Sequence, residues 1–187
     1  MVIVYALASK SLNKLYIFRG DKEYTDAQIQ LMLNKPTLQP LGQQQCFVPG
    51  VPHGAGGTVS NSLSRFFLPV DEVELQLTNI LENLSKDPWN VAHGDRPLRC
   101  TGSALNVAAL LLGSTFPQTG ARIMLFSAGP GTLNPGMIVG PKLKEPIRSH
   151  SDIDKDNGKH YKKAIKFYDA LAKKIVKNSH TVDILAG

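Results

Sequence analysis

Two short apolar segments separated by one long amphipathic segment constrain the fold of this chain more than any other feature. Residues 121–127 (ARIMLFS) have the pattern of a buried strand that runs into a Gly-Pro-Gly turn. A helical pattern follows from about residue 154 to 178, and residues 181–186 form a second strand pattern. This order predicts a right-handed βαβ unit and places the chain in the α/β class. Open α/β sheets usually carry their sites in the loop that follows such a strand.

The helix over residues 154–178 is predicted to be amphipathic. Its outer face carries seven lysines between residues 159 and 177, which we interpret as a solvated face, since no recognised nucleic-acid module accompanies them. We therefore expect no nucleic-acid partner. The inward face is predicted to hold Tyr161, Ile165, Tyr168, Leu171, Ala172, Ile175 and Val176.

Three further helices and two strands are predicted upstream. Residues 2–7 and 15–18 have strand patterns, and Thr25 with Gln28 has the spacing of a capping box before a short helix that Pro36 ends. The second helix is predicted to begin at Asp71, which acts as its cap. The third covers residues 101–112, is apolar nearly all round and ends near Gly113. The apolar positions of the first helix are Ile29, Met32 and Leu33, and those of the second are Val73, Leu77, Ile80, Leu81 and Leu84.

Length and composition fit one domain over residues 1–187. The chain has a net charge of +6, which suits acidic partners or an anionic membrane surface contacted peripherally. Residues 38–64 are rich in glycine and proline, so a flexible insertion is expected there. Cys46 and Cys100 are the only cysteines and form no CxxC pair, so a zinc site is poorly supported.

No motif assigns a catalytic, cofactor or metal site. The chain has no G-x-S-x-G elbow, and its five histidines have no neighbouring motif that gives them roles. The run from Asp152 to Asp156 begins like a calcium loop, but Asn157 and Lys163 stand where glycine and a bidentate glutamate are needed. We interpret these carboxylates as caps of the following helix.

Four residues are candidates for partner binding. Arg96, Arg99 and Arg148 lie in predicted loops, where they suit directional contacts with partner carboxylates or, equally, pin the loops to backbone carbonyls. Phe116 follows a helix end and is either a hydrophobic anchor for a partner or a core residue. The residues alone leave these alternatives open.

Seven segments in order carry a resemblance to a known family. The segments are residues 18–20 (FRG), 87–89 (DPW), 96–99 (RPLR), 115–124 (TFPQTGARIM), 135–140 (PGMIVG), 146–149 (PIRS) and 152–157 (DIDKDN). With these segments the chain resembles the trunk domain of the GTPase-activating inner-coat subunit of coat protein complex II (COPII), the Sec-twenty-three family, more than the trunk of the cargo-adaptor sister. Only the insertion lies outside the resemblance.

The resemblance implies a von Willebrand A-like (Rossmann-like) trunk, incomplete at both ends. It implies an interaction scaffold, not an enzyme, that binds the cargo-adaptor subunit, the Sar-type small GTPase and outer-coat subunits on the cytoplasmic side of endoplasmic-reticulum exit sites. The family's arginine finger and zinc lie in other domains, so no cofactor is expected here. A stand-alone von Willebrand A-like ligand-binding module is the alternative.

An incomplete trunk also implies an open sheet edge. If the family's first strands are missing, the strand over residues 121–127 exposes unpaired backbone, which invites another strand. We expect either that the strand over residues 2–7 moves against it or that the chain associates with itself.

Overall fold

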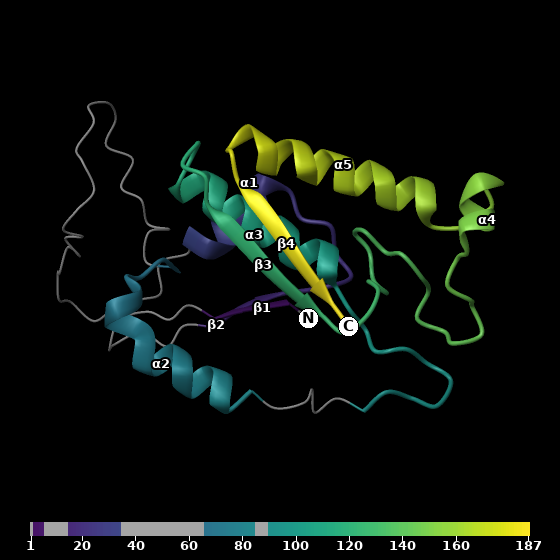
Figure 1. The fold of residues 1–187 in the computed structure, drawn as a ribbon, viewed down its shortest axis with the longest axis horizontal. Helices are drawn as coiled ribbons and strands as arrows, with labels where there is room; N and C mark the ends of the chain where they lie inside the picture. Colours follow the sequence, from purple (N-terminus) through teal and green to yellow (C-terminus); the bar gives the residue numbers. More distant parts are fainter. Residues whose placement is uncertain (1, 6–14, 35–65, 85–89) are drawn as a thin grey trace.

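The chain mixes helices and strands in a way that is consistent with the α/β class. The computed structural model describes residues 2–5, 15–34, 66–84 and 90–187. The insertion at 38–64 and Cys46 lie outside these ranges. The elements are β1 (Val2–Tyr5), β2 (Leu15–Phe18), α1 (Asp26–Asn34), α2 (Val70–Glu82), α3 (Thr101–Thr115), β3 (Arg122–Ser127), α4 (His150–Asp154), α5 (Tyr161–Lys177) and β4 (Thr181–Ala186) (Figure 1).

Strands β3 and β4 form a parallel pair joined through α4 and α5. Arg122 aligns with Thr181 and Ser127 with Ala186, so all six residues of each strand are in register. The predicted strand–helix–strand unit is confirmed. The predicted long helix is wrong at its start, because α4 ends at Asp154 and α5 begins at Tyr161. Asp156 between them has φ +57°, a left-handed conformation that interrupts a right-handed helix.

One core lies between α3, α5 and one face of the β3–β4 sheet. Leu105 and Ala109 of α3 meet Leu171 and Ile175 of α5, with Ile123, Leu125 and Val182 of the sheet packed against them. Leu171 and Ile175 confirm the predicted inward face, and Tyr161 and Tyr168 are partly buried. Three inward predictions are wrong, since α5 packs along a narrower stripe that leaves exposed Ile165, Ala172 and Val176.

The other side of α3 carries a second core with α1 and β2. Phe18, Ile29 and Leu33 pack there against Val107 and Leu111. The predicted capping box is present, since the Thr25 N–H donates to Gln28 Oε1 at 3.1 Å and the Gln28 N–H to Thr25 Oγ1 at 3.3 Å. Helix α3 is covered from two sides, as its apolar sequence predicts. It continues to Thr115, so the predicted end near Gly113 is wrong.

Helix α2 differs from its prediction in its cap and its burial. Pro69 occupies the N-cap, and Asp71 lies in the first turn, where its charge complements the helix dipole. Of the predicted apolar face only Val73 is buried. Leu77, Leu81 and Leu84 are exposed, because no described element covers that side of the helix.

Strand β1 pairs with β2 in an antiparallel hairpin, from Val2 opposite Phe18 to Tyr5 opposite Leu15. This pair is a separate two-stranded sheet from β3–β4. The expectation that residues 2–7 move against the strand at 121–127 is therefore wrong. Pairing β1 with β2, ten residues along the chain, costs less loop-closure entropy than pairing it with β3, more than a hundred residues away.

The helices of the described ranges include none with the length and hydrophobicity that a membrane span requires.

Candidate interaction site: the arginine-clamped loop

The loop from β3 to α4, residues 128–149, is held in place by contacts with both flanking helices, and we call it the clamped loop. The Tyr168 hydroxyl of α5 donates to the Gly136 carbonyl at 3.1 Å. Gly102, in the first turn of α3, faces the Pro135 carbonyl so closely that a Cβ there would collide with it. The loop therefore lies directly against the start of α3 and the inner side of α5.

Thr132 joins the clamped loop to the segment before α3. Its side chain is fully buried, accepts the Arg99 N–H at 2.8 Å and donates to the Pro97 carbonyl at 2.9 Å. The Arg99 carbonyl in turn accepts from the Thr132 and Leu133 N–H groups. The Arg99 guanidinium donates to the Ala128 carbonyl at 3.1 Å. Arg99 thus binds the loop through both its backbone and its side chain.

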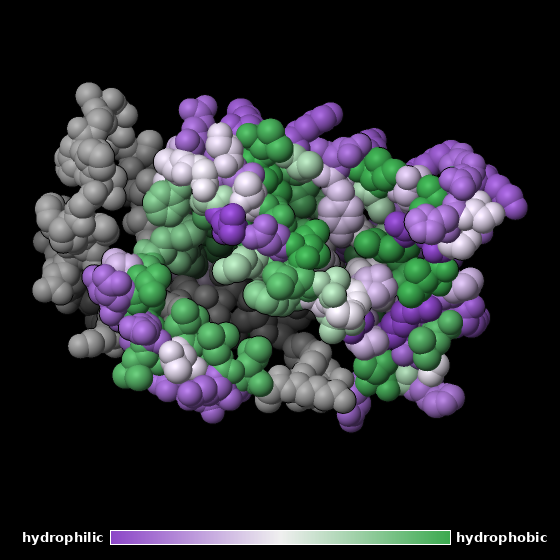
Figure 2. All heavy atoms as spheres, in the orientation of Figure 1, coloured by the Kyte–Doolittle hydropathy of each residue, from purple (hydrophilic) through white to green (hydrophobic). Residues whose placement is uncertain are grey.

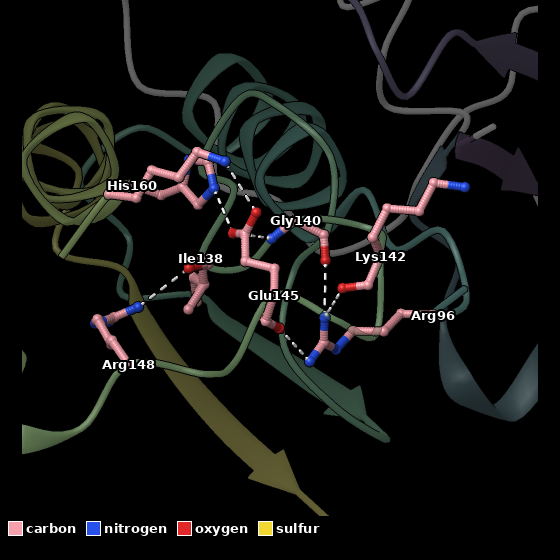
Figure 3. Close-up of polar contacts among 8 residues, drawn as sticks. Arg96, Ile138, Gly140, Lys142, Glu145, Arg148 and His160 are labelled. Atoms are coloured by element: carbon pink, nitrogen blue, oxygen red, sulfur yellow. Dashed lines mark hydrogen bonds and ion pairs between the residues drawn. The ribbon is translucent and has the colours of Figure 1, made fainter. Parts of the chain in front are cut away.

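Arg96 binds three carbonyls of the clamped loop (Figure 3). Its Nη1 donates to the carbonyls of Gly140 and Lys142, and its Nη2 donates to that of Glu145 at 2.7 Å. The backbone runs alongside, since the Arg96 N–H donates to the Pro141 carbonyl at 2.6 Å. Lys142 and Asp95 add an ion pair at 2.8 Å. A planar guanidinium with several fixed donors suits this convergence of carbonyls.

Glu145 is the acidic centre of the site. Its carboxylate accepts from the Gly140 N–H at 2.9 Å, from Lys159 Nζ at 3.0 Å and pairs with His160 Nε2 at 2.8 Å. These three contacts lower the pKa of the Glu145 carboxyl from 4.5 to about 2, and the hydrogen bond from Lys159 has the largest effect. Glu145 therefore links the clamped loop to the start of α5.

Arg148 closes the loop near α4. Its Nη1 donates to the Ile138 carbonyl at 3.3 Å, and its guanidinium lies over the Tyr161 ring at 5.3 Å from the centroid. Its Nε is buried and makes no hydrogen bond to a described residue. Together with Glu145 and His160, Arg148 borders an open pocket of about 200 Å³.

The structure brings three of the four predicted partner-binding residues to one loop. Arg96, Arg99 and Arg148 each bind its backbone carbonyls, which confirms the pinning alternative and leaves their contact with a partner a prediction. Phe116 lies elsewhere, at the C-cap of α3, where its ring packs edge-on to Phe67 at a centroid distance of 4.9 Å. Its role as a partner anchor also stays a prediction.

Sequence reasoning missed Glu145 and Thr132. Glu145 stands within a segment read only for its cations, although a single acid among Lys142, Lys144 and Arg148 is a signal of local ion pairing. Thr132 carries no signal, because a buried hydroxyl is recognised only once the chain folds around it.

The carboxylates after the clamped loop were predicted to cap the following long helix, and this prediction is wrong: Asp152 caps the short helix α4, whereas the N-cap of α5 is His160, which makes no side-chain capping bond. The Asp152 carboxylate accepts the Ser149 N–H at 2.7 Å, and Ser149 Oγ accepts the Asp152 N–H at 3.2 Å, which completes a capping box for α4. These bonds lower the pKa of Asp152. Asp156 forms an ion pair with Lys162. Within the described ranges, no group of three His, Cys, Asp or Glu residues is placed to hold a metal ion.

Replacing Arg96 by lysine is expected to lower the free energy of unfolding by about 1.5–3 kcal/mol, the range for hydrogen bonds to charged groups. Lysine keeps the charge but cannot span three carbonyls. Urea unfolding followed by circular dichroism measures the change. Arg122→Lys, at an exposed arginine of β3, is the control and should change it by less than about 0.5 kcal/mol. Equal losses of stability in the two variants would contradict the role of Arg96 in holding the clamped loop.

The contacts of the Glu145 carboxylate with Gly140, Lys159 and His160 are expected to lose their stabilising effect in acid. Because the folded pKa is lowered to about 2 from 4.5, the contribution is complete above about pH 4.5 and is lost as the pH falls toward 2. Glu145→Gln should therefore flatten the fall of the melting temperature across this window. Glu74→Gln, at an exposed position of α2, is the matched control and should leave the slope unchanged. If the melting temperature of Glu145→Gln fell with pH as steeply as that of the unmodified chain, the stabilising role of the ionised Glu145 carboxylate would be contradicted.

The chain matches a model of a known protein family. The family model described as the Sec23/Sec24 trunk domain matches residues 1–187, the whole chain. The match includes the clamped loop, whose residues 135–140 and 146–149 are among the segments that resemble the same family.

Proposed function

Because the chain belongs to the Sec23/Sec24 trunk domain family, we propose that it acts as a protein-interaction scaffold of the COPII inner coat in endoplasmic-reticulum-to-Golgi transport. The family membership indicates a role in the COPII coat. The match over the whole chain is the observation that carries the proposal. The family has two kinds of member, and the resemblance of residues 129–140 favours the GTPase-activating one.

The proposed partners are the cargo-adaptor subunit, the Sar-type small GTPase and outer-coat subunits. Peripheral contact with an acidic membrane on the cytoplasmic side of exit sites fits the net charge of +6. The clamped loop supports docking by a partner, because Arg96 and Arg99 already hold its backbone. A surface ordered before binding loses less conformational entropy when the partner arrives.

The direct test is a pull-down of the adaptor and of the GTPase, separately, by the 187-residue chain. We expect each to be retained, in buffer with or without a chelator. Arg96→Lys should weaken retention, whereas Lys173→Gln, which removes one charge from an exposed position of α5, should not. Retention of neither partner would contradict the proposal. Loss of binding in the chelator would favour a metal-dependent ligand-binding module.

We also expect the chain alone to leave the rate of GTP hydrolysis by the Sar-type GTPase unchanged. An arginine finger raises such rates by about 10³–10⁵. The resemblance implies that the family's finger comes from another domain, and Arg96, Arg99 and Arg148 each bind carbonyls of the clamped loop. Phosphate release under multiple turnover measures the rate, with a complete GTPase-activating subunit as the positive control. Strong stimulation by the chain would overturn this expectation.

A further inference from the structure

Residues 142–147 (KLKEPI) form the tip of the clamped loop, and we call them the loop tip. The Glu145 carboxylate ties the tip to the start of α5 through Lys159 and His160, and the Arg96 guanidinium binds two of its carbonyls (Figure 3). Apart from Glu145, every residue of the tip is exposed. The exposed side chains therefore stand on a backbone that is already held in place.

Two large apolar side chains of the loop tip are open to solvent. Leu143 is 55% exposed and Ile147 is 56% exposed. Leu98, also exposed, lies on the segment before α3, which the Leu143 N–H joins to the tip by donating to the Gly94 carbonyl at 2.9 Å. Figure 2 shows hydrophobic residues among hydrophilic ones where the clamped loop lies in Figure 1. Single exposed leucines are common, but three apolar residues on two joined segments mark an interaction surface.

The same two segments carry an excess of positive charge. Residues 90–99 and 128–149 contain five arginines and lysines but only two acids, Asp95 and Glu145. Both carboxylates are already paired with lysine ammonium groups, at 2.8 Å and 3.0 Å respectively. The three arginines bind carbonyls, which bring no negative charge to balance theirs. Lys144 is exposed, and within the described ranges its side chain pairs with no acid.

We propose that the loop tip is the contact point for an acidic surface of a partner protein. Leu143 and Ile147 enter an apolar hollow of the partner, and Lys144 pairs with a carboxylate at the rim of that hollow. Protein interfaces commonly have this anatomy, with a few apolar anchors at the centre and charged groups around them. The inference rests on the proposed function, because it assigns a surface to the protein partners of the scaffold.

A protein partner fits the loop tip better than an anionic membrane does. Recognition of anionic lipids generally uses clusters of about four to eight lysines and arginines. Lys142 is paired with Asp95, so Lys144 is the one cation of the tip without an acidic partner among the described residues. A backbone fixed before binding also suits a shaped protein surface, since less conformational entropy is lost on docking.

Binding of the adaptor subunit and of the GTPase to the immobilised 187-residue chain, measured separately by biolayer interferometry, tests this contact. The double variant Leu143→Ser/Ile147→Ser should weaken binding of at least one of the two proteins by about tenfold or more, mainly through faster dissociation. Leu75→Ser/Leu81→Ser replaces two exposed leucines of α2 and is the matched control, which should leave both affinities unchanged. Circular dichroism shows whether each variant is folded.

The charge of Lys144 should act on association more than on dissociation. Lys144→Glu should lower the association rate constant several-fold at low salt and make that rate less sensitive to added salt. Lys173→Glu makes the same change of charge at an exposed position of α5 and should keep the salt dependence of the unmodified chain.

Hydroxyl-radical footprinting gives a readout that needs no substitution. The side chains of Leu143 and Ile147 should be labelled readily in the free chain and should be protected once the partner is bound. Those of Leu75 and Leu81 should be labelled equally in both states.

The outcomes separate this inference from the proposed function. If a folded Leu143→Ser/Ile147→Ser chain bound both proteins as tightly as the unmodified chain, the loop tip would be excluded as the contact and the scaffold role would stand. Retention of neither protein by the unmodified chain would refute the proposed function, and this inference with it. A tip variant that still bound both proteins but lost binding to phosphatidylserine vesicles would assign the tip to a membrane and overturn the inference.

Discussion

Replacing Leu171 by alanine is expected to lower the free energy of unfolding by about 2–5 kcal/mol, the range for a buried leucine that leaves a cavity. Leu171 is 4% exposed and lies where α5 meets Leu105 and Ala109 of α3. To close the gap, α5 would have to shift relative to α3 and the sheet, with which it packs in one core. The variant therefore removes a contact that three elements share.

Thermal and urea unfolding followed by circular dichroism measure this loss. Val176→Ala is the control, because Val176 lies on the same helix with its side chain exposed and should change stability by less than about 0.5 kcal/mol. If both variants were equally stable, the core between α3 and α5 would be assigned wrongly.

Replacing Gly102 by alanine is expected to loosen the clamped loop and to destabilise the chain by about 1–3 kcal/mol, as overpacking usually does. Alanine is more favourable than glycine in a helix by about 1 kcal/mol, so helix propensity alone predicts that Gly102→Ala stabilises the chain. The new Cβ, however, meets the Pro135 carbonyl and lies 2.9 Å from the Phe167 ring. The backbone of the loop must therefore shift before α3 can accept the methyl group.

Gly113→Ala provides a control within the same helix. A Cβ at Gly113 meets only the end of the Asn178 side chain, at 2.8 Å, and that side chain can rotate away. This variant should be neutral or stabilising, by up to about 1 kcal/mol. Exchange of the Thr132 and Leu133 amides should quicken in Gly102→Ala and not in Gly113→Ala. A Gly102→Ala chain as stable as Gly113→Ala would contradict the close approach of loop and helix.

Local patterns predicted the elements that depend on neighbouring residues. The capping box of Thr25 and Gln28, the strand now seen at Arg122–Ser127 and its parallel partner at Thr181–Ala186 all follow from spacing and hydrophobic periodicity. The start of α5 was mispredicted because Ser149 and Asp152 begin a separate short helix. That capping pair is visible in the sequence only as one of several plausible starts.

Burial was predicted less well than helicity. The apolar positions of α2 are periodic, yet Leu77 and Leu81 are exposed, and on α5 Val176 is exposed although it continues the stripe of Leu171 and Ile175. Periodicity reports which side of a helix is apolar. How much of that side is covered depends on which other elements reach it.

By itself the sequence determined the α/β class, the order of β3, α5 and β4 and, through seven short segments, the family. Each of these depends on local periodicity or on residues close together in the chain. Only the tertiary structure decided what Arg96, Arg99 and Arg148 bind, because their acceptors are backbone carbonyls, which every residue has and no sequence pattern marks. The same holds for the pairing of β1 with β2 rather than with β3, because the partner of a strand depends on which other strands reach it, and the residues of the strand itself do not specify that partner.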